Sequence, residues 1–282
     1  MLTARQSKKF FDLPQEVKDK VPHPPEGWWH RGYSGFGREK VTQMLFDPEL
    51  KGDAKKIPDV KESFEMGKEN NPKCPNIWLP EEDLPGFRAF FNQFYGIMNQ
   101  LELEVFRALA IGMDIEEEFF VSYHQNADNQ TRILHYPPVS EDLLRSGHAE
   151  RIGAHCDFGT ITFLFQDQVG GLEIEDPHQP GVFRPVPYIP NTVLVNAGDF
   201  LQIWTNDILK STSHRVQAPS IVGGNGEGKI IPARYSIPYF CGPDTEKTME
   251  CAPNCYGPDR PKKYGPTTVG QYIDAKMNAL YS

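Results

Sequence analysis

Short β-prone stretches separated by turn signals dominate residues 131–240. The stretches cover 131–136, 152–157, 160–166, 172–175, 183–187, 193–196, 200–205, 214–218 and 233–240. A regular series of short strands with Gly, Pro and Asn between them is typical of a barrel or jelly roll. The glycine-rich run 223–228 is interpreted as a hairpin loop. A phosphate-binding GxGxxG loop is rejected, because such a loop needs a helix after it and none follows here. We therefore expect the central part of the chain to be mainly β.

Helical patterns flank these strands. Apolar residues recur at three- and four-residue steps over 84–113, and weaker patterns cover 8–21 and 267–281. Asp114 suits the N-cap of one more helix over 114–121, whereas the Pro-, Gly- and Lys-rich residues 22–83 are expected to be irregular. We predict one structural unit, with a helical and irregular region over 1–125, a β core over 126–245 and a helical segment over 246–282.

Charge and composition limit the classes of partner. The chain has 282 residues, of which 39% are hydrophobic, and a net charge of −9. This sign disfavours a nucleic-acid partner, whose phosphates attract basic proteins. No apolar run approaches the ~20 residues of a membrane span, and the polar first nine residues lack the apolar region of a signal peptide. Five cysteines, an odd number, do not suggest a disulfide framework, so we expect a cytoplasmic protein.

His155 and Asp157 are two residues apart in the expected strand 152–157, so their side chains should project from one face. His214 follows after enough residues for the intervening strands to return it beside the first strand. Two imidazoles and one carboxylate make the facial triad of non-haem Fe(II) oxygenases, which leaves positions open for substrate and O2. A lone histidine in a strand is usually structural, but these three ligands in this order predict a metal site.

Arg234 and Ser236 form a second pair on one strand face. A guanidinium and a hydroxyl placed in this way can bind a carboxylate by charge-assisted hydrogen bonds. Taken alone, Arg234 fits an ordinary salt bridge of a barrel equally well. Together with the metal residues, the pair indicates an organic acid co-substrate and oxygen chemistry. Asn196, which precedes the pair in the chain, is expected only to cap a turn.

Residues 153–162, Gly-Ala-His-Cys-Asp-Phe-Gly-Thr-Ile-Thr, resemble the His-x-Asp strand of the Fe(II)/2-oxoglutarate-dependent dioxygenases, in the branch that includes isopenicillin N synthase-like enzymes. Further matching segments are 132–138, 165–173, 195–206 and 213–216, and residues 10–14 and 32–33 resemble the family's N-terminal region. The resemblance covers nearly the whole chain. Residues 28–33 and the long glycine-rich loop look more fungal than plant.

The resemblance implies a double-stranded β-helix core, a jelly roll of the cupin type. It implies that His155, Asp157 and His214 hold Fe(II) and are the catalytic residues. It also implies 2-oxoglutarate and O2 as co-substrates, with ascorbate as a reductant. The expected reaction hydroxylates a small molecule, or desaturates it or rearranges a ring, with release of succinate and CO2, in secondary metabolism.

The resemblance further implies that Arg234, Ser236 and the Tyr136 hydroxyl bind the 5-carboxylate of 2-oxoglutarate. The chain departs from the family where Leu134 replaces the Asn of the Arg-x-x-Asn-x-Tyr-Pro-Pro segment, and in the long loop between His214 and Arg234. That loop is a hairpin or a lid.

Three other functions remain open at this point. An iron oxidase of the isopenicillin N synthase type would use the same triad without 2-oxoglutarate. A Zn²⁺ hydrolase would use the same ligands but leaves Arg234 and Ser236 unexplained. A non-catalytic barrel that binds a small acid would not need an intact triad.

The substrate pocket is the least determined part of the site. Candidates to line it from the strands or the aromatic loop are Tyr33, Phe36, His135, Phe158 and Phe240. We expect a small-molecule substrate, neither nucleic acid nor membrane as a partner, and a monomer or weak homodimer.

Overall fold

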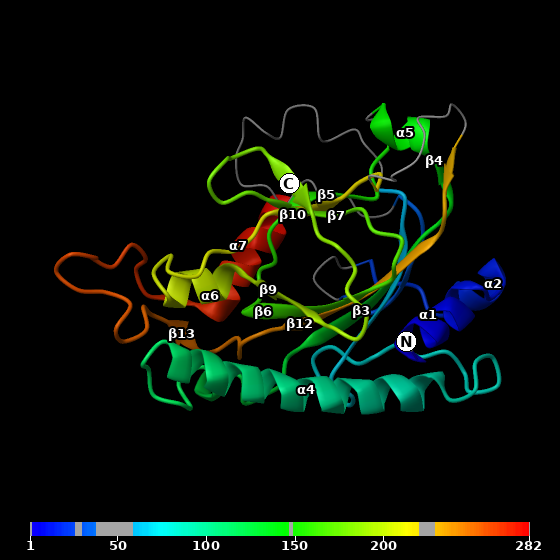
Figure 1. Ribbon diagram of the computed structural model, residues 1–282. Coiled ribbons are helices and arrows are strands. Elements are labelled where there is room, and N and C mark those ends of the chain that lie inside the picture. The colour runs from blue at the N-terminus through cyan, green and yellow to red at the C-terminus, as the bar shows by residue number, and fades with distance from the viewer. Residues whose placement is uncertain (1, 26–29, 38–58, 147–148, 220–228, 282) are drawn as a thin grey trace.

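Two antiparallel sheets form the centre of the computed structural model, which describes residues 2–25, 30–37, 59–146, 149–219 and 229–281. The larger sheet runs, in spatial order, β1 (Gly32–Ser34), β2 (Glu62–Gly67), β3 (Gln130–Tyr136), β12 (Arg234–Cys241), β6 (Ile161–Gln166) and β9 (Leu194–Ala197). The smaller sheet runs β5 (Ile152–His155), β10 (His214–Val216), β7 (Leu172–Glu175) and β8 (Phe183–Pro185). Figure 1 shows the smaller sheet as a layer above the larger one.

Two short strand pairs extend this core. Strand β4 (Val139–Ser140) pairs with β11 (Ile230–Ile231), and β13 (Thr248–Met249) pairs with β14 (Thr267–Thr268). The helices are α1 (Leu2–Phe11), α2 (Gln15–Lys18), α4 (Phe87–Gly112), α5 (Glu141–Arg145), α6 (Asp199–Trp204) and α7 (Val269–Tyr281), with a 3-10 turn at Val121–Tyr123. No helix among these described residues is long and apolar enough to cross a membrane.

Helix α4 covers the outer face of the larger sheet, below it in Figure 1. Its buried side chains, among them Phe87, Phe91, Tyr95, Met98 and Phe106, recur at helical spacing and form one apolar stripe. The stripe closes two apolar clusters against the sheet. Burial of each large apolar side chain stabilises the fold by roughly 1.5–3 kcal/mol. This face of α4 therefore holds the helix firmly against the sheet.

Strand alternation gives the larger sheet an inner face. Strand β12 pairs with β3 so that Arg234 lies opposite Tyr136 and Phe240 opposite Gln130. These four residues lie an even number of positions apart on their strands, so they share the face directed at the smaller sheet. All four line the cavity between the layers. The register therefore sets one end of the cavity at Tyr136 and the other at Gln130.

The expected strands and helices are largely confirmed, with four differences. Residues 200–205 were expected as a strand, but residues 199–204 form α6, whose apolar side chains are buried at i, i+1, i+3 and i+4. Asp114 does not cap a helix: its φ of 54° is left-handed and a series of turns follows. The expected helix 8–21 is two helices separated at Pro14, whose extended backbone (ψ 148°) begins α2. Strands β1 and β2 lie within the region expected to be irregular. The glycine-rich run 223–228 lies outside the described residues.

Candidate active site

The cavity between the two sheets has a volume of about 290 Å³. It is lined by the inner faces of β3, β6 and β12, by the smaller sheet and by Ile273 of α7. Its walls are mostly apolar, and most of the polar side chains are gathered in three places. These are a His/Asp/His cluster (His155, Asp157 and His214), an arginine end (Arg234, Ser236 and Tyr136) and a second polar end (His30, Gln130 and Arg132). A largely apolar cavity with few convergent polar groups is the usual form of a small-molecule site.

The His/Asp/His cluster is the one that the sequence predicts. The Nε2 atoms of His155 and His214 lie 3.9 and 3.8 Å from the same oxygen of Asp157, Oδ1. One ligand atom from each residue falls within 4.8 Å of the others. Strands β5 and β10 bring the histidines together, because His155 and His214 are paired across the ladder. Three donors converging on one point can hold a single metal ion.

Each ligand is oriented by a second partner. The Nδ1 atoms of His155 and His214 lie 2.8 and 3.0 Å from the backbone oxygens of Gly153 and Thr212. If each Nδ1 carries the proton, the Nε2 lone pair is left for a metal, the arrangement common among histidine ligands. Burial, and then the neighbouring His214, lower the pKa of His155 to about 3, so its ring is neutral at physiological pH.

Asp157 is held by its other oxygen. The Thr162 hydroxyl and the Asn196 amide donate to Asp157 Oδ2, at 2.7 and 2.9 Å, which leaves Oδ1 directed at the histidines. Burial alone would raise the pKa of Asp157, but the two imidazoles and these hydrogen bonds lower it overall, so the group is a carboxylate. The expectation that Asn196 only caps a turn is therefore wrong.

The position of Asp157 depends on helix α6. Strand β5 ends at His155, so Asp157 lies in the turn beyond it rather than on the strand. The first backbone N–H groups of α6, those of Asp199 and Phe200, donate to the oxygens of Asp157 and Gly159 at 2.9 and 3.2 Å. These N–H groups have no partner within the helix. A strand at 200–205 would not have provided this support.

The arginine end contains Arg234, Ser236 and Tyr136, as predicted. Arg234 is 1% exposed; its Nη1 donates to the Ser236 hydroxyl at 3.1 Å, and its guanidinium carbon lies 5.0 Å from the centre of the Tyr136 ring. Nη2 donates to Gln166 at 3.2 Å. Its third nitrogen, Nε, is buried and has no hydrogen-bond partner among the described residues.

A second buried arginine, Arg151, was not identified from the sequence. It is 0% exposed, lies 5.8 Å from the centre of the same Tyr136 ring, and donates from Nη2 to the Pro232 oxygen. Burial, and then the charge of Arg234, lower its pKa to about 10. Neither arginine has an ion pair with a carboxylate of the described residues. Two adjacent buried cations without an acid are costly unless an anion binds beside them.

The structure brings two of the five expected substrate residues to the cavity. Phe158 and Phe240 line it. Tyr33 and His135 instead lie on the outer face of the sheet and bond to the Glu62 carboxylate, at 2.6 and 2.7 Å. His135 alternates with Tyr136 along β3 and must face the other way. Phe36 is 54% exposed and is not among the residues that line the cavity.

Comparisons with known proteins agree with this geometry. The model of the 2OG-Fe(II) oxygenase superfamily matches residues 127–243, and that of the "non-haem dioxygenase in morphine synthesis N-terminal" region matches residues 3–81. The proline hydroxylase buaE of Petromyces alliaceus is 40% identical over 98% of this chain and 83% of its own length. The 2-oxoglutarate-dependent dioxygenase htyE of Aspergillus rugulosus is 37% identical, with the same coverage.

A solved structure is similar over the same extent. A full-length Neurospora crassa protein crystallised in complex with alpha-KG (2-oxoglutarate) and thymine superposes with a TM-score of 0.84 at 41% identity, over 98% of this chain and 81% of that protein. The chain belongs to the 2OG-Fe(II) oxygenase superfamily, and its fold is the jelly roll of that family. It is a 2-oxoglutarate-dependent dioxygenase, an oxidoreductase that uses Fe(II), 2-oxoglutarate and O2 to oxidise a small molecule.

Proposed function

We propose that His155, Asp157 and His214 hold the Fe(II) ion. The donor set fits this metal, because two neutral imidazoles and one carboxylate are the facial triad of non-haem iron oxygenases. The support is the convergence of their three ligand atoms, with the other ring nitrogens and the other carboxylate oxygen held by neighbours. Bound iron supplies the chemistry that couples decarboxylation of 2-oxoglutarate to oxidation of the substrate.

The arginine end binds the 5-carboxylate of 2-oxoglutarate. Arg234 donates to one side of this group, with the Ser236 and Tyr136 hydroxyls as further donors. Arg151 adds a second positive charge behind the same ring. This assignment rests on one observation: both guanidiniums are buried, and neither forms an ion pair with a carboxylate of the described residues. Leu134, where the family has Asn, lines the cavity and lies opposite Ser236 on the neighbouring strand, where it offers only apolar contact.

The prime substrate is a compact molecule that lies between Phe158 and Phe240. The cavity is at the lower end of the ~300–1,000 Å³ typical of ligand pockets, and 2-oxoglutarate must occupy part of its 290 Å³. Similar proteins are described as a proline hydroxylase and as a complex with thymine, and both of these molecules are single rings. The fungal relatives support a place in secondary metabolism.

The chain's own residues direct the reaction in two ways. The apolar walls exclude water from the space beside the ligand cluster, which protects the oxidising species from side reactions. Phe158 and Phe240 fix which C–H bond faces the metal. We propose hydroxylation as the main outcome; desaturation and ring rearrangement are variants of the same hydrogen abstraction.

The test is a mass-spectrometric screen of small fungal metabolites with Fe(II), 2-oxoglutarate and ascorbate. A substrate is expected to gain roughly 16 mass units when an oxygen atom is added, or to lose roughly 2 when two hydrogen atoms are removed. Either change should occur in step with succinate release. The variant His155→Ala should lose both products. His178→Ala, an exposed histidine remote from the cluster, should keep them. Retention of full activity by His155→Ala would contradict the ligand assignment.

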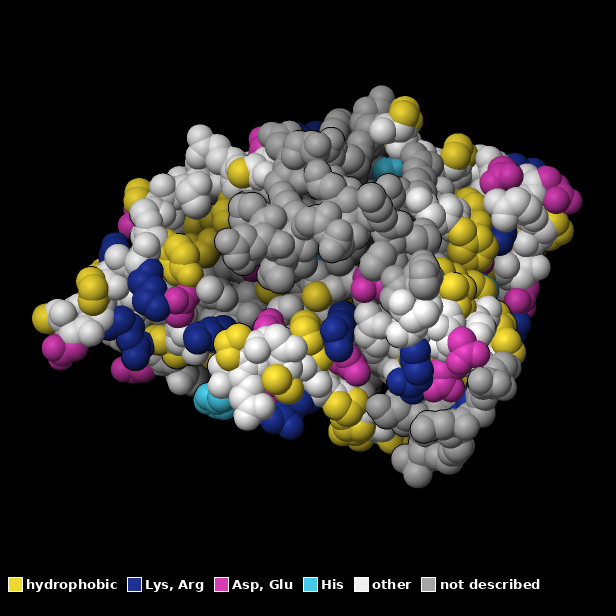
Figure 2. Space-filling model, turned by 90° about the horizontal axis from the view of Figure 1, so that it is seen from above, with side chains coloured by type: hydrophobic (Ala, Val, Ile, Leu, Met, Phe, Trp, Pro, Cys, Tyr) yellow, Lys and Arg dark blue, Asp and Glu magenta, His cyan; other side chains and the backbone are white. Residues whose placement is uncertain are grey.

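We further propose a cytoplasmic enzyme that is a monomer or weak homodimer. All five cysteines are free, which suits a reducing compartment. On the described part of the face shown in Figure 2, basic and acidic side chains are intermixed, whereas nucleic-acid-binding surfaces are clustered and basic. Sedimentation at two protein concentrations tests the oligomeric state.

A further inference from the structure

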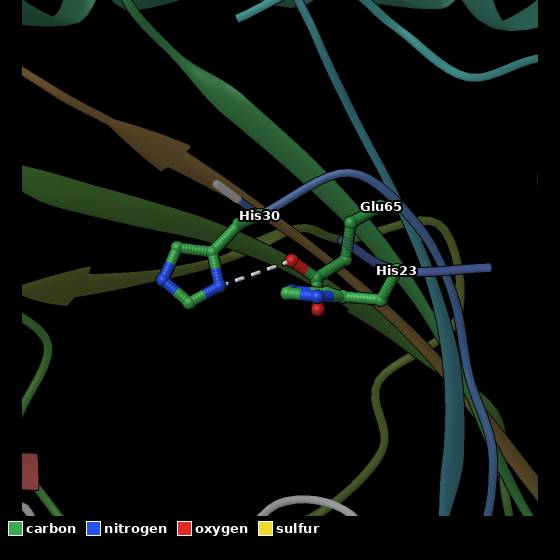
Figure 3. A group of neighbouring side chains, drawn as sticks. All are labelled: His23, His30 and Glu65. Carbon is green, nitrogen blue, oxygen red and sulfur yellow. Dashed lines mark ion pairs between the residues drawn. The ribbon is translucent and has the colours of Figure 1, made fainter. Parts of the chain in front are cut away.

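The described residues offer one further group of possible metal ligands, His23, His30 and Glu65. Figure 3 shows the three side chains grouped together, with His30 Nδ1 3.4 Å from Glu65 Oε2. A metal ion here would compete with Arg132 Nη2 and Gln130 Nε2, each of which lies 2.8 Å from an oxygen of Glu65. It would also be repelled by the adjacent guanidinium. This group therefore fits hydrogen bonding, and we turn to the residues that support the His/Asp/His cluster.

Helix α7 packs beside α6 and the turn that follows β5 (Figure 1). The start of α7 is fixed, because the backbone N–H groups of Val269 and Gly270 donate to the oxygens of Lys247 and Thr245, at 3.0 and 2.9 Å. One turn further on, Ile273 lines the cavity. Helix α7 is therefore part of the wall of the active site.

Asp199, the first residue of α6, makes contacts in two directions. Its backbone N–H donates to the backbone oxygen of Asp157 at 2.9 Å. Its carboxylate faces α7: the Tyr272 hydroxyl donates to Oδ2 at 2.9 Å, and Lys276 Nζ lies 2.7 Å from the same oxygen. The side chains of Asp199 and Lys276 are nearly buried. Water and salt therefore screen this ion pair much less than a pair on the surface.

Two ring contacts join the same elements. Lys276 Nζ lies 5.4 Å from the centre of the Phe158 ring, which attracts a cation over its face. The Tyr272 ring lies 5.1 Å from that of Phe200, whose backbone N–H donates to the Gly159 oxygen at 3.2 Å. Helix α7 thus contacts the turn 157–159 directly in its middle, and through α6 at both of its ends.

An acidic residue in the first turn of a helix has an ordinary explanation. Its carboxylate interacts favourably with the helix dipole, by about 0.3–1 kcal/mol. This interaction explains Asp199 but neither of its partners on α7. Tyr272 and Lys276 are four residues apart, so they share one face of α7, and both contact a single oxygen of Asp199. The arrangement is that of a joint between two helices.

We propose that Asp199 is a positioning residue through which α7 holds the metal ligand Asp157 in place. The proposal rests on the proposed function, since it takes Asp157 to be a ligand of Fe(II). While Lys276 and Tyr272 hold the Asp199 side chain, the Asp199 N–H stays directed at the backbone oxygen of Asp157. When these contacts are lost, the first turn of α6 is free to shift, and the turn that carries Asp157 loses its backbone donor.

Hydrogen exchange in the metal-free protein tests this anchor without metal or turnover. In Lys276→Met, the N–H groups of Asp199 and Phe200 should exchange about tenfold faster, which corresponds to about 1.4 kcal/mol less protection. Tyr272→Phe removes one hydrogen bond and keeps the ion pair, so it should act in the same direction with a smaller effect. The N–H groups of α4 should exchange as in the wild type.

Titration of Fe(II) without O2 tests the consequence for the metal. The Kd should rise about tenfold in Lys276→Met, the lower end of the ~10–100-fold typical when a group that orients a metal ligand is lost. The double variant Asp199→Asn/Lys276→Met leaves no unpaired buried charge. It should lose no more affinity than the weaker-binding single variant, because both residues act through one contact.

The other end of α6 provides matched controls. Just beyond its last turn, Asp207 accepts a hydrogen bond from the Tyr264 hydroxyl at 2.6 Å and lies 2.5 Å from Lys263 Nζ. Tyr264→Phe and Lys263→Met therefore remove the same kinds of contact away from the turn of Asp157. Both should keep the wild-type exchange at Asp199 and the wild-type Kd for Fe(II).

Three results would contradict the proposal or its premise. If Asp199→Asn speeds exchange but Lys276→Met and Tyr272→Phe do not, Asp199 serves α6 alone and the joint is rejected. If the N–H groups of α4 exchange faster by the same factor, the variants act on general stability and the joint is again rejected. If the wild type binds no Fe(II), the ligand assignment of the proposed function fails, whereas the exchange results still decide whether α7 anchors the turn.

Discussion

Replacing Arg234 by Gln should separate its role in binding 2-oxoglutarate from any role in stability. The side chain is buried beside Arg151 and makes no ion pair with a described carboxylate. A guanidinium in an ordinary salt bridge stabilises the fold, and its loss leaves a buried acid behind. Here the loss removes one of two adjacent buried cations instead. The apoprotein should therefore be as stable as the wild type, or more stable.

The effect on the co-substrate should be large and opposite. Gln keeps one amide donor but loses the positive charge, so about one charge-assisted hydrogen bond of ~1.5–3 kcal/mol disappears. At about 1.4 kcal/mol for each factor of ten, the Kd for 2-oxoglutarate should rise roughly 10- to 100-fold. Arg151 remains as a second positive charge and limits the loss.

Two measurements on the same preparations test this reasoning. Titration of 2-oxoglutarate into the Fe(II)-loaded protein without O2 gives the Kd, and thermal unfolding of the metal-free protein gives the stability. Arg184→Gln, which breaks a half-exposed pair with Asp176, is the control and should alter neither. An unchanged Kd, or a marked loss of apoprotein stability with little change in Kd, would show that Arg234 is a structural residue.

Three more changes have definite expected results. Asn196→Leu should weaken Fe(II) binding by about 10- to 100-fold, because it removes a hydrogen bond that orients Asp157; a metal titration showing wild-type affinity would reject this role. Glu102→Gln should stabilise the protein at pH 7 by roughly 1–3 kcal/mol, because burial raises the pKa of Glu102 to about 8 and the wild type must take up a proton to fold. Since the folded pKa exceeds the unfolded value, the stability of the wild type should fall relative to the variant as the pH rises from about 4.5 to 8; denaturant melts that show a constant difference over this range would contradict the sign. Phe240→Ala should raise the KM for the prime substrate without changing the Kd for 2-oxoglutarate, and an equal change in both constants would place Phe240 outside the substrate space.

The fold was predictable where periodicity and length agree. Strands β3, β7 and β12 were located as short β-prone stretches bounded by turn signals, and the stripe of α4 from its three- and four-residue steps. The run at 200–205 was not, since a short buried apolar segment satisfies either period. Its conformation is decided by tertiary contacts: its first N–H groups bond to the loop that carries Asp157.

The site was predictable only for residues close to a recognisable motif. His155, Asp157 and His214 come together as expected. Arg151 carries no local signal, since an arginine before a strand is commonly exposed. It is buried against the Tyr136 ring, a contact between residues on different strands that no local pattern announces. His135 was misplaced because the alternation that puts Tyr136 inside puts its neighbour on β3 outside. Tyr33 was misplaced because its strand, β1, was expected to be an irregular loop; on that strand its hydroxyl bonds to Glu62 instead.

Strand β3 lines the cavity from one end to the other, so its register positions both ends together. Along β3, Tyr136 and Gln130 are six residues apart, about 20 Å at the rise of a strand. A slip of one residue between β3 and β12 would turn Arg132 and Tyr136 out of the cavity together. Substitutions at Gln130 or Arg132 that preserve the register leave the arginine end unchanged. If 2-oxoglutarate binds at the arginine end as proposed, we therefore expect such substitutions to leave its Kd unchanged.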